Sequence, residues 1–405
     1  MEWKEVTLGE ISSKIGDGLH GTPKYDDEGP YYFINGNNLN CGKIIIKDDT
    51  KRVGIDEFVK NQKELNEQTL LVSINGTIGN VAKYNNEPCI LGKSACYINV
   101  IKEVDKEFIY YVLTSANFKR NITNEATGTT IKNVSLKQMR EYKFNIPCNI
   151  ADQRRIASIL SSLDRKIELN NKINADLEEM AQAIFKNWFV DFEPFKDGKF
   201  VDSELGMIPE GWKVGRLDEI ADVVGGSTPS KAKPEYYTQK GIAWLTPKDL
   251  SNHPAVYTSR GEIDITEEGY NSTSTKLMPK GTILFTSRAP IGYISIAQND
   301  ICTNQGFKSL VPRKAGTCFL YCFLKYVTPV IENKSTGSTF KEASGSLMKS
   351  LQVIMPEQKV FEEFEEIVSP LFARIESLEK ENSRLSLLRD TLLPRLMSGE
   401  LEVPE

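Results

Sequence analysis

Residue types that commonly perform catalysis are present in this chain of 405 residues, but not in catalytic combinations. Glu357-Gln358-Lys359 has the Glu-x-Lys spacing found in some nucleases. It follows Pro356 at the start of an expected helix, however, where a glutamate stabilises the positive helix end without taking part in chemistry. The chain has neither a GxxxxGK[ST] phosphate-binding loop nor an Asn/Asp-Pro-Pro-aromatic methyltransferase motif. We therefore expect no catalytic site, and no cofactor bound by this chain.

The possible metal ligands are few and scattered. His20 and His253 are the only histidines, and the seven cysteines form no CxxC pair. Cys318 and Cys322 are four residues apart in an apolar stretch, so they would share one face of a helix. This pattern is typical of buried thiols rather than of a metal site. We expect no bound metal.

Short polar loops offer hydrogen bonds and positive charge instead of catalysis. In the first part of the chain they contain Thr22, Lys24, Asn35, Asn37, Asn38, Asn75, Thr77, Lys93, Ser94, Thr129, Thr130 and Lys132. In the second part they contain Ser227, Thr228, Ser230, Lys231, Lys248, Arg288, Asn304, Gln305, Ser338, Thr339 and Lys341. Gly, Asn, Ser and Pro form turns in every protein, so each loop taken alone is as well explained as a turn.

These loops belong to an internal duplication. Trp3-Lys4 recurs as Trp212-Lys213, and TGTTIK (127–132) recurs as TGSTFK (336–341). Further matches keep the same order, with an offset near 209 residues. Preserved order at a constant offset indicates two similar domains, which we place at residues 1–150 and 208–355.

Each copy has the pattern of a mixed α+β domain. Short runs rich in β-forming residues alternate with Gly, Pro, Asn and Asp, and one helical stretch lies near residues 106–118 and again near 316–327. The β-type runs are 31–34, 43–46 and 69–74 in the first copy and 241–245, 282–285 and 293–296 in the second. The fold class expected is therefore α+β, with two similar domains.

A long helix is expected after each domain. Apolar residues recur at spacings of three and four through residues 151–192 and again through 356–405, the pattern of a coiled coil. Residues 193–207 would link the first helix to the second domain. Because the second helix starts at the second domain, it must run back along the first, which predicts an antiparallel, pseudo-twofold pair. Both chain termini should then lie near the first domain.

Two asparagines interrupt the apolar seam of these helices at equivalent steps. Asn174 and Asn382 both stand near mid-helix, where a leucine would be expected. We predict that they approach one another and fix the register of the pair. The alternative is that they face a partner subunit or solvent.

Aromatic residues gather at the end of the first helix. Phe185, Trp188 and Phe189 would either form a docking face for a partner or cap the helix pair against the neighbouring domain. The sequence favours neither alternative.

Charge is unevenly distributed. The net charge is −5, but acidic residues are in excess in 151–207 and 356–405, whereas basic residues are in excess in 208–355. This distribution permits nucleic-acid binding by the domains. No apolar run is long enough to span a bilayer, and the first residues are charged, so we expect no membrane partner and a cytoplasmic location.

The most specific motifs are GMIPEGWKVGRLDEI (206–220), AQAIFKNWFVDFEPF (181–195) and LRDTLLPRLMSGELEVP (388–404). With the duplication and the long helices, they make the whole chain resemble the specificity (S) subunit of type I restriction-modification systems. The resemblance implies two target recognition domains, and it implies that the polar loops named above bind DNA. It also implies helices that dock partner subunits.

The resemblance further implies a non-catalytic subunit that recognises a bipartite, asymmetric target in double-stranded DNA. Its partners would be two methyltransferase subunits and, through the complex, restriction/translocase subunits. The methyltransferase is expected to use S-adenosylmethionine, and the restriction subunit ATP and Mg. Alternatives are the specificity subunit of a related multisubunit type II system, a single-chain restriction enzyme with a cryptic site, and a coiled-coil spacer that binds no DNA.

Overall fold

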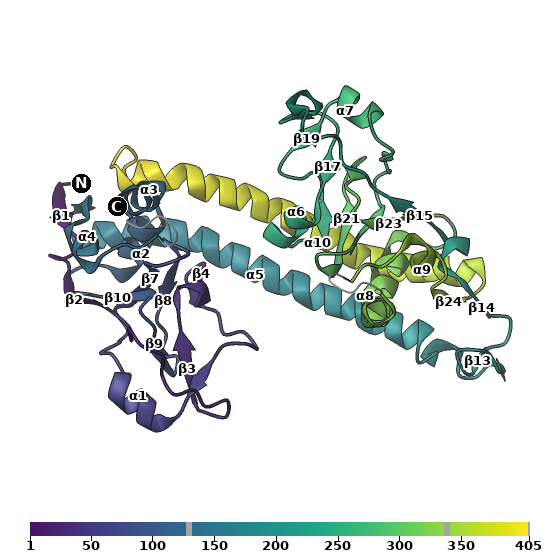
Figure 1. The fold of residues 1–405 in the computed structure, drawn as a ribbon, viewed down its shortest axis with the longest axis horizontal. Coiled ribbons are helices and arrows are strands. Elements are labelled where there is room, and N and C mark those ends of the chain that lie inside the picture. The colour runs from purple at the N-terminus through teal and green to yellow at the C-terminus, as the bar shows by residue number, and fades with distance from the viewer. Residues whose placement is uncertain (127–131, 336–340, 404–405) are drawn as a thin grey trace. The chain divides into compact units, whose positions relative to one another are not determined.

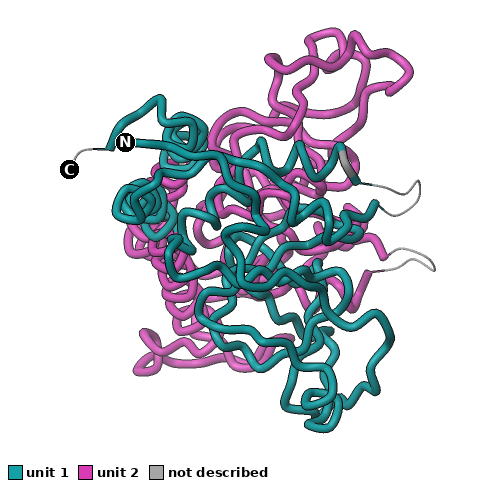
Figure 2. Tube along the Cα trace, turned by 90° about the vertical axis from the view of Figure 1, so that its left-hand side faces the viewer, with its two compact units in different colours: residues 1–167, 384–405 teal, residues 168–383 magenta. Residues whose placement is uncertain are grey.

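The computed structural model describes residues 1–126, 132–335 and 341–403. The chain divides into two compact units, of which the first is built from two separate stretches of sequence and the second from one (Figure 2). Unit 1 comprises Met1–Ile167 and Arg384–Glu405, and unit 2 comprises Glu168–Ser383. The boundaries fall inside two long helices, so each helix contributes to both units.

Unit 1 is built around an antiparallel sheet. Its strands are, in spatial order, β2 (Ser12–Asp17), β10 (Ala95–Val100), β7 (Thr69–Ser73) and β8 (Val81–Lys83). The other strands are β1 (Trp3–Thr7) with β11 (Lys143–Pro147), β6 (Arg52–Val53) with β3 (Tyr31–Ile34) and β9 (Cys89–Leu91), and β4 (Leu39–Asn40) with β5 (Lys43–Ile44). Every residue of β7 and β10 is buried, which identifies these two strands as the centre of the domain.

The short helices of unit 1 are α1 (Ile55–Asn61), α2 (Lys106–Thr114), α3 (Ala116–Glu125) and α4 (Leu136–Glu141). A side chain caps the start of α2, α3 and α4. Asp105 accepts a hydrogen bond from the Phe108 amide at the start of α2, and Ser115 does the same for Phe118 in α3. Helix α2 buries Phe108 and its neighbours in the same core as the central strands.

Unit 2 repeats this plan (Figure 1). Its main sheet has the order β15 (Ala221–Gly225), β23 (Lys308–Pro312), β20 (Ile283–Ser287), β21 (Ile291–Ala297) and β18 (Tyr257–Thr258). The remaining strands pair as β14 (Lys213–Arg216) with β24 (Gln352–Met355), β17 (Trp244–Leu245) with β22 (Cys302–Thr303), β16 (Tyr237–Thr238) with β19 (Asp264–Ile265), and β12 (Phe200–Val201) with β13 (Ile208–Pro209). The α-helices within this unit are α6 (Pro247–Asn252), α7 (Glu267–Asn271), α8 (Thr317–Lys334) and α9 (Gly345–Lys349).

The predicted duplication is confirmed by the order of the strands. The order β2–β10–β7–β8 of unit 1 is the order β15–β23–β20–β21 of unit 2, and both β3–β9 and β17–β22 are parallel pairs. The units differ at the helix after the sheet. Ser115 ends α2 and caps α3, whereas α8 runs on without a break for 18 residues.

The long helices are α5 (Ile150–Phe189) and α10 (Gln358–Met397), each of 40 residues. In unit 2, Asn170 is bonded to Asn382 while Phe189 packs on Phe361, so the two helices run antiparallel. In unit 1, an ion pair of 2.7 Å between Asp164 and Arg389 continues the antiparallel pairing. The antiparallel direction inferred from the sequence is therefore confirmed by the two contacts in unit 2.

The two ends of the chain meet in unit 1. The Met1 amino group lies 4.0 Å from a Glu402 carboxylate oxygen, and the Trp3 ring covers Gly399. Both termini thus belong to the first domain, as expected. In the described part of the chain, no helix combines the length and apolarity that a membrane span requires.

Candidate functional site

The polar loops of unit 2 converge at one end of its main sheet. The Ser227 amide donates to the Thr303 carbonyl at 2.9 Å, and Thr228 bonds through its hydroxyl to the Gln305 side chain. The Ser287 amide donates to the Gly306 carbonyl at 2.8 Å. These bonds join the ends of β15, β20 and β22. We call this set of loops (residues 226–230, 246–248, 287–290, 304–307 and 341–343) loop edge 2.

The corresponding loops of unit 1 converge in the same way. The Lys93 amide donates to the Leu19 carbonyl at 2.9 Å. The Ser94 hydroxyl donates to Asn35 Oδ1 at 2.8 Å and accepts from the Gly36 amide at 2.9 Å. We call this set (residues 18–24, 35–38, 75–77, 92–94 and 132–133) loop edge 1.

Equivalent glycines allow the chain to pass through both edges. Gly18 and Gly226 each follow the first strand of the main sheet. A Cβ atom at Gly18 would collide with the Leu91 and Gly92 carbonyls, and one at Gly226 would collide with the Thr303 and Asn304 carbonyls. Backbone therefore packs directly on backbone at the same point in both units.

One cluster of charged side chains lies on loop edge 2 and the adjoining strand. Glu342 lies between two cations, with Arg288 Nη1 at 3.6 Å and Lys308 Nζ at 3.4 Å from its carboxylate oxygens. The Lys308 side chain is only 16% exposed, whereas those of Arg288 and Glu342 are 37% and 39% exposed. On loop edge 1 an amide pair stands at this point, with Asn75 Nδ2 donating to Asn133 Oδ1 at 3.3 Å.

Most of the predicted binding residues that the structure describes are accessible. Those on the surface are Thr22, Lys24, Asn37, Thr77, Lys93, Lys132, Ser230, Lys231, Lys248, Gln305 and Lys341. Asn35, Asn75, Ser94, Ser227, Thr228, Arg288 and Asn304 are half-buried. Thr129, Thr130, Ser338 and Thr339 lie outside the described residues. Three of the accessible side chains have intramolecular partners: Lys248 pairs with Glu262, the Lys341 ammonium reaches the Glu332 carbonyl, and the Gln305 side chain accepts from the Thr228 hydroxyl.

Asn38 was wrongly predicted to be a contact residue. It is 5% exposed, its amide nitrogen donates to the Ile45 carbonyl at 3.0 Å, and its oxygen accepts from the Asn35 amide. Because both ends of the side chain are engaged inside the domain, Asn38 holds the 35–38 turn and is not free to bind a ligand.

Lys308 and Glu342 were not among the predicted binding residues. Glu342 follows the predicted Lys341 directly, but its neighbours Arg288 and Lys308 are 54 and 34 positions away in the sequence. These three side chains come together only in the folded domain. Apolar periodicity and turn-forming residues therefore could not predict the contact.

The aromatic residues of α5 belong to the core of unit 2. Phe185 and Phe189 are 2% and 4% exposed and pack on Phe319 and Phe364. Trp188 is half-buried against the same cluster. The suggestion that Phe185 and Phe189 form a docking face is thus wrong, because burial leaves no surface for a partner.

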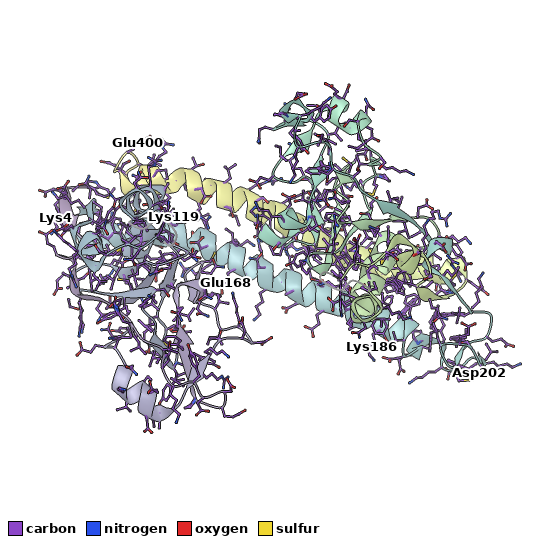
Figure 3. All side chains as sticks on the ribbon, viewed as in Figure 1. Lys4, Lys119, Glu168, Lys186, Asp202 and Glu400 are labelled. Carbon is purple, nitrogen blue, oxygen red and sulfur yellow. The ribbon has the colours of Figure 1, made fainter. Side chains whose placement is uncertain are left out.

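An exposed lysine marks the other face of this helix. Lys186, labelled in Figure 3, pairs with Asp191 at 2.6 Å, and its side chain is 58% exposed. Because its aromatic side chains are buried in the core of unit 2, the end of α5 caps the helix pair against the second domain. This was the second of the two alternatives for these residues.

The predicted contact between Asn174 and Asn382 is replaced by a neighbouring one. Asn382 Oδ1 accepts from Asn170 Nδ2 at 2.8 Å, and Asn382 Nδ2 donates to Asn171 Oδ1 at 2.8 Å. Asn174 Oδ1 is buried without a partner. In an antiparallel pair related by a pseudo-twofold axis, equivalent residues face each other only where that axis passes between the helices. Because Asn382 faces Asn170 and Asn171, the axis passes α5 at Lys172. Asn174 and Asn382 both lie two residues beyond it, so they are offset by about four residues, or ~6 Å.

The described residues offer no chemically reactive cluster. Burial raises the pKa of the Cys89 and Cys302 thiols to about 12, and it raises those of Cys318 and Cys322 as well. Cys318 and Cys322 are buried thiols, as predicted. In the ranges that the structure covers, no three His, Cys, Asp or Glu side chains group as metal ligands would.

One glycine-rich stretch has the spacing of a nucleotide-binding loop but not its structure. Residues 16–21 have the GxGxxG spacing of dinucleotide-binding loops. They run from the end of β2 into loop edge 1 and are not followed by a helix. Without the helix N-terminus that binds the pyrophosphate, this spacing does not indicate a nucleotide site.

Comparison with known proteins gives a consistent result. A family model described as "Type I restriction modification DNA specificity domain" matches residues 1–179 and 209–387, once for each copy. The type I restriction enzyme MjaIX specificity subunit of Methanocaldococcus jannaschii is 40% identical over 190 residues, which are 46% of this chain and 44% of that protein. The HindI specificity subunit of Haemophilus influenzae is 27% identical over 359 residues, 73% and 77% of the two chains.

The fold agrees with a solved structure. The S subunit of a type I restriction-modification system from M. genitalium has a TM-score of 0.58 with 21% identity, covering 98% of this chain and 96% of that chain. At this identity the likeness concerns the fold alone, whereas the family model matches both sequence repeats. The chain therefore belongs to the family of type I restriction-modification specificity subunits.

Proposed function

We propose that this chain is the DNA-recognising subunit of a restriction-modification complex, and that each loop edge binds one half of a split target in double-stranded DNA. The observation that carries this proposal is the presence of two loop edges that stand at equivalent strand ends and carry different side chains. Two surfaces of one construction with different chemistry suit two different half-sites, and hence an asymmetric target.

The charges of the loops fit this role. Lysines at equivalent positions, Lys132 and Lys341, are exposed on the two edges and suit phosphate contacts. Half-buried amides and one arginine lie beside them and suit base edges in the major groove. Acidic excess is confined to segments dominated by the long helices, so it does not oppose DNA at the loop edges.

The long helices would serve two purposes. Because α5 is one continuous helix shared by both units, it would set the number of base pairs between the two half-sites. Exposed apolar residues such as Leu169 and Met180 on α5 and Leu387 and Leu388 on α10 would contribute to docking two methyltransferase subunits. Restriction/translocase subunits would join through the complex.

The chain itself would supply recognition and no chemistry. In this proposal the methyltransferase subunits bind S-adenosylmethionine, and the restriction subunits use ATP and Mg. The purified chain alone should therefore neither methylate nor cleave DNA. Either activity in the isolated chain would favour a single-chain restriction enzyme instead.

Selection from random DNA tests the proposal. The full chain, co-purified with its methyltransferase subunit, would be used to enrich binders from a randomised duplex pool, and the bound DNA would be sequenced. We expect two short sequence blocks of different composition, separated by a gap of constant length. Enrichment of a single contiguous block, or of none, would contradict the two-domain account.

A further inference from the structure

The two loop edges carry one structurally equivalent side-chain pair with different chemistry. The Val134 amide donates to the Ile74 carbonyl at 2.9 Å, and the Ala343 amide donates to the Ser287 carbonyl at the same distance. Asn75 and Arg288 each follow the accepting residue. Asn133 and Glu342 each precede the donating residue. The same backbone bond therefore sets the two pairs at the same point of the two domains.

The side chains beside this shared bond differ between the units. In unit 1, Asn75 Nδ2 donates to Asn133 Oδ1 at 3.3 Å. In unit 2, Arg288 Nη1 lies 3.6 Å from Glu342 Oε2, and the less exposed Lys308 contacts the other oxygen of Glu342 at 3.4 Å. An amide pair in one domain is thus an ion pair in the other.

A role in folding does not explain this difference. The backbone bond closes the loop against the strand in both domains, whichever side chains are present. Arg288 and Glu342 remain 37% and 39% exposed, so their ion pair contributes little to stability. Where exposed side chains select a ligand, we expect them to differ between the two copies while the backbone bond that positions them is the same.

Resting on the proposed function, we propose that these pairs determine one base of each half-site: Arg288, positioned by Glu342, recognises a guanine, and Asn75, positioned by Asn133, recognises an adenine. Arginine forms two hydrogen bonds with guanine O6 and N7, and asparagine forms two with adenine N6 and N7. Glu342 and Asn133 act through their neighbours and are positioning residues.

The partner side chains make this recognition efficient. A guanidinium has five N–H donors, and Glu342 engages one nitrogen at ion-pair distance, which leaves donors for a base. Holding the group before DNA arrives lowers the conformational entropy lost on binding. Lys308 fixes Glu342 from the buried side, so the carboxylate is itself held in place.

The first test replaces the arginine in the full chain. Arg288→Ala is compared with the wild type by selection from random duplexes, with the methyltransferase subunit present. We expect the preference for guanine at one position of one half-site to fall roughly ten- to hundredfold, while every other position is unchanged. Glu342→Gln should weaken the same position and no other.

Arg313→Ala is the matched control. Arg313 also carries one positive charge and pairs with Asp222 at 3.3 Å, but it follows the opposite end of β23 from Lys308. Its removal should leave all base preferences intact. Melting temperatures of all variants should stay close to that of the wild type, because neither Arg288 nor Arg313 is fully buried.

The second test introduces the arginine–glutamate pair of unit 2 at the equivalent positions of unit 1. Asn75→Arg combined with Asn133→Glu places the unit 2 pair on the unit 1 frame. We expect one position of the other half-site to change from adenine to guanine. Loss of binding by the double variant with a wild-type melting temperature would contradict the equivalence of the two pairs.

The outcomes separate this inference from the proposed function. If the wild type enriches no sequence, the proposed function fails. If the wild type enriches a bipartite target and Arg288→Ala enriches the same target with unchanged base frequencies, the function stands and the inference is wrong. An equal loss at all positions would mean that Arg288 contacts phosphate rather than a base.

Discussion

At the scale of single residues, the polar loops illustrate what a sequence can and cannot predict. Turn-forming residues and repeated lysines identify the loops, because Gly, Asn and Lys signal exposed turns locally. The partners of Arg288 are not local, since Lys308 and Glu342 come from other strands and loops. Asn38 shows the opposite error: a polar residue in a predicted loop is buried as part of the turn.

Phosphate contacts are tested by removing Lys132 or Lys341, which are exposed at equivalent positions. Each Lys→Ala change should weaken binding to all DNA sequences about equally and reduce the slope of log K against log salt by ~1 unit, because one fewer counterion is released. Binding would be measured by fluorescence anisotropy over a range of salt concentrations.

Lys280→Ala is the control for this measurement, because Lys280 is exposed just before β20, at the opposite end of that strand from loop edge 2. If it lowers the salt slope as much as Lys341→Ala does, the slope reflects overall charge and the assigned contact is wrong.

Glu379 provides a pH-dependent prediction within unit 2. Burial raises its carboxyl pKa to about 7, with further increases from Glu178 and Glu376, although the amides of Val256 and Tyr257 donate to it and lower the pKa. The folded state therefore holds the proton more tightly than the unfolded state between pH 4.5 and about 7. Stability should fall as the pH rises through this window.

Glu379→Gln removes the titration and should flatten this part of the stability profile. The difference between wild type and variant across the window should be on the order of 1–3 kcal/mol, measured by urea unfolding at pH 5, 6, 7 and 8. Parallel profiles for the two proteins would show that Glu379 titrates normally.

At the scale of elements, the repeat made much of the fold predictable. Two copies of each motif at a constant offset predict two domains with the same strand order, and the seam predicts α5 and α10. The register was missed by one turn because equivalent residues face each other only at the crossing point. Apolar periodicity does not locate that point, whereas the Asn170–Asn382 bond does.

The end of α5 gives a test of burial against docking. Phe189→Ala should destabilise unit 2 by ~3–5 kcal/mol, because it opens a cavity among Phe319, Phe361 and Phe364. Lys186→Ala, on the exposed face of the same turn, should change stability by less than ~0.5 kcal/mol. Denaturant unfolding measures both. A stable Phe189→Ala variant that only loses partner binding would restore the docking interpretation.

At the scale of the whole molecule, the chain is a duplicated domain whose two copies share a backbone frame and differ in exposed chemistry. Family membership follows from both repeats and could be anticipated from the sequence motifs. In our proposal the target sequence depends on side chains that differ at equivalent positions, such as the pairs Asn75–Asn133 and Arg288–Glu342, and sequence motifs do not reveal those contacts.

The central claim is that each domain recognises its own half-site. The most direct measurement is selection from random duplexes with the full chain carrying Asn35→Ala, Asn75→Ala and Lys93→Ala, all on loop edge 1, in complex with the methyltransferase subunit. We expect one sequence block to disappear while the other block keeps its base frequencies. Equal weakening of both blocks, or no change in either, would contradict it.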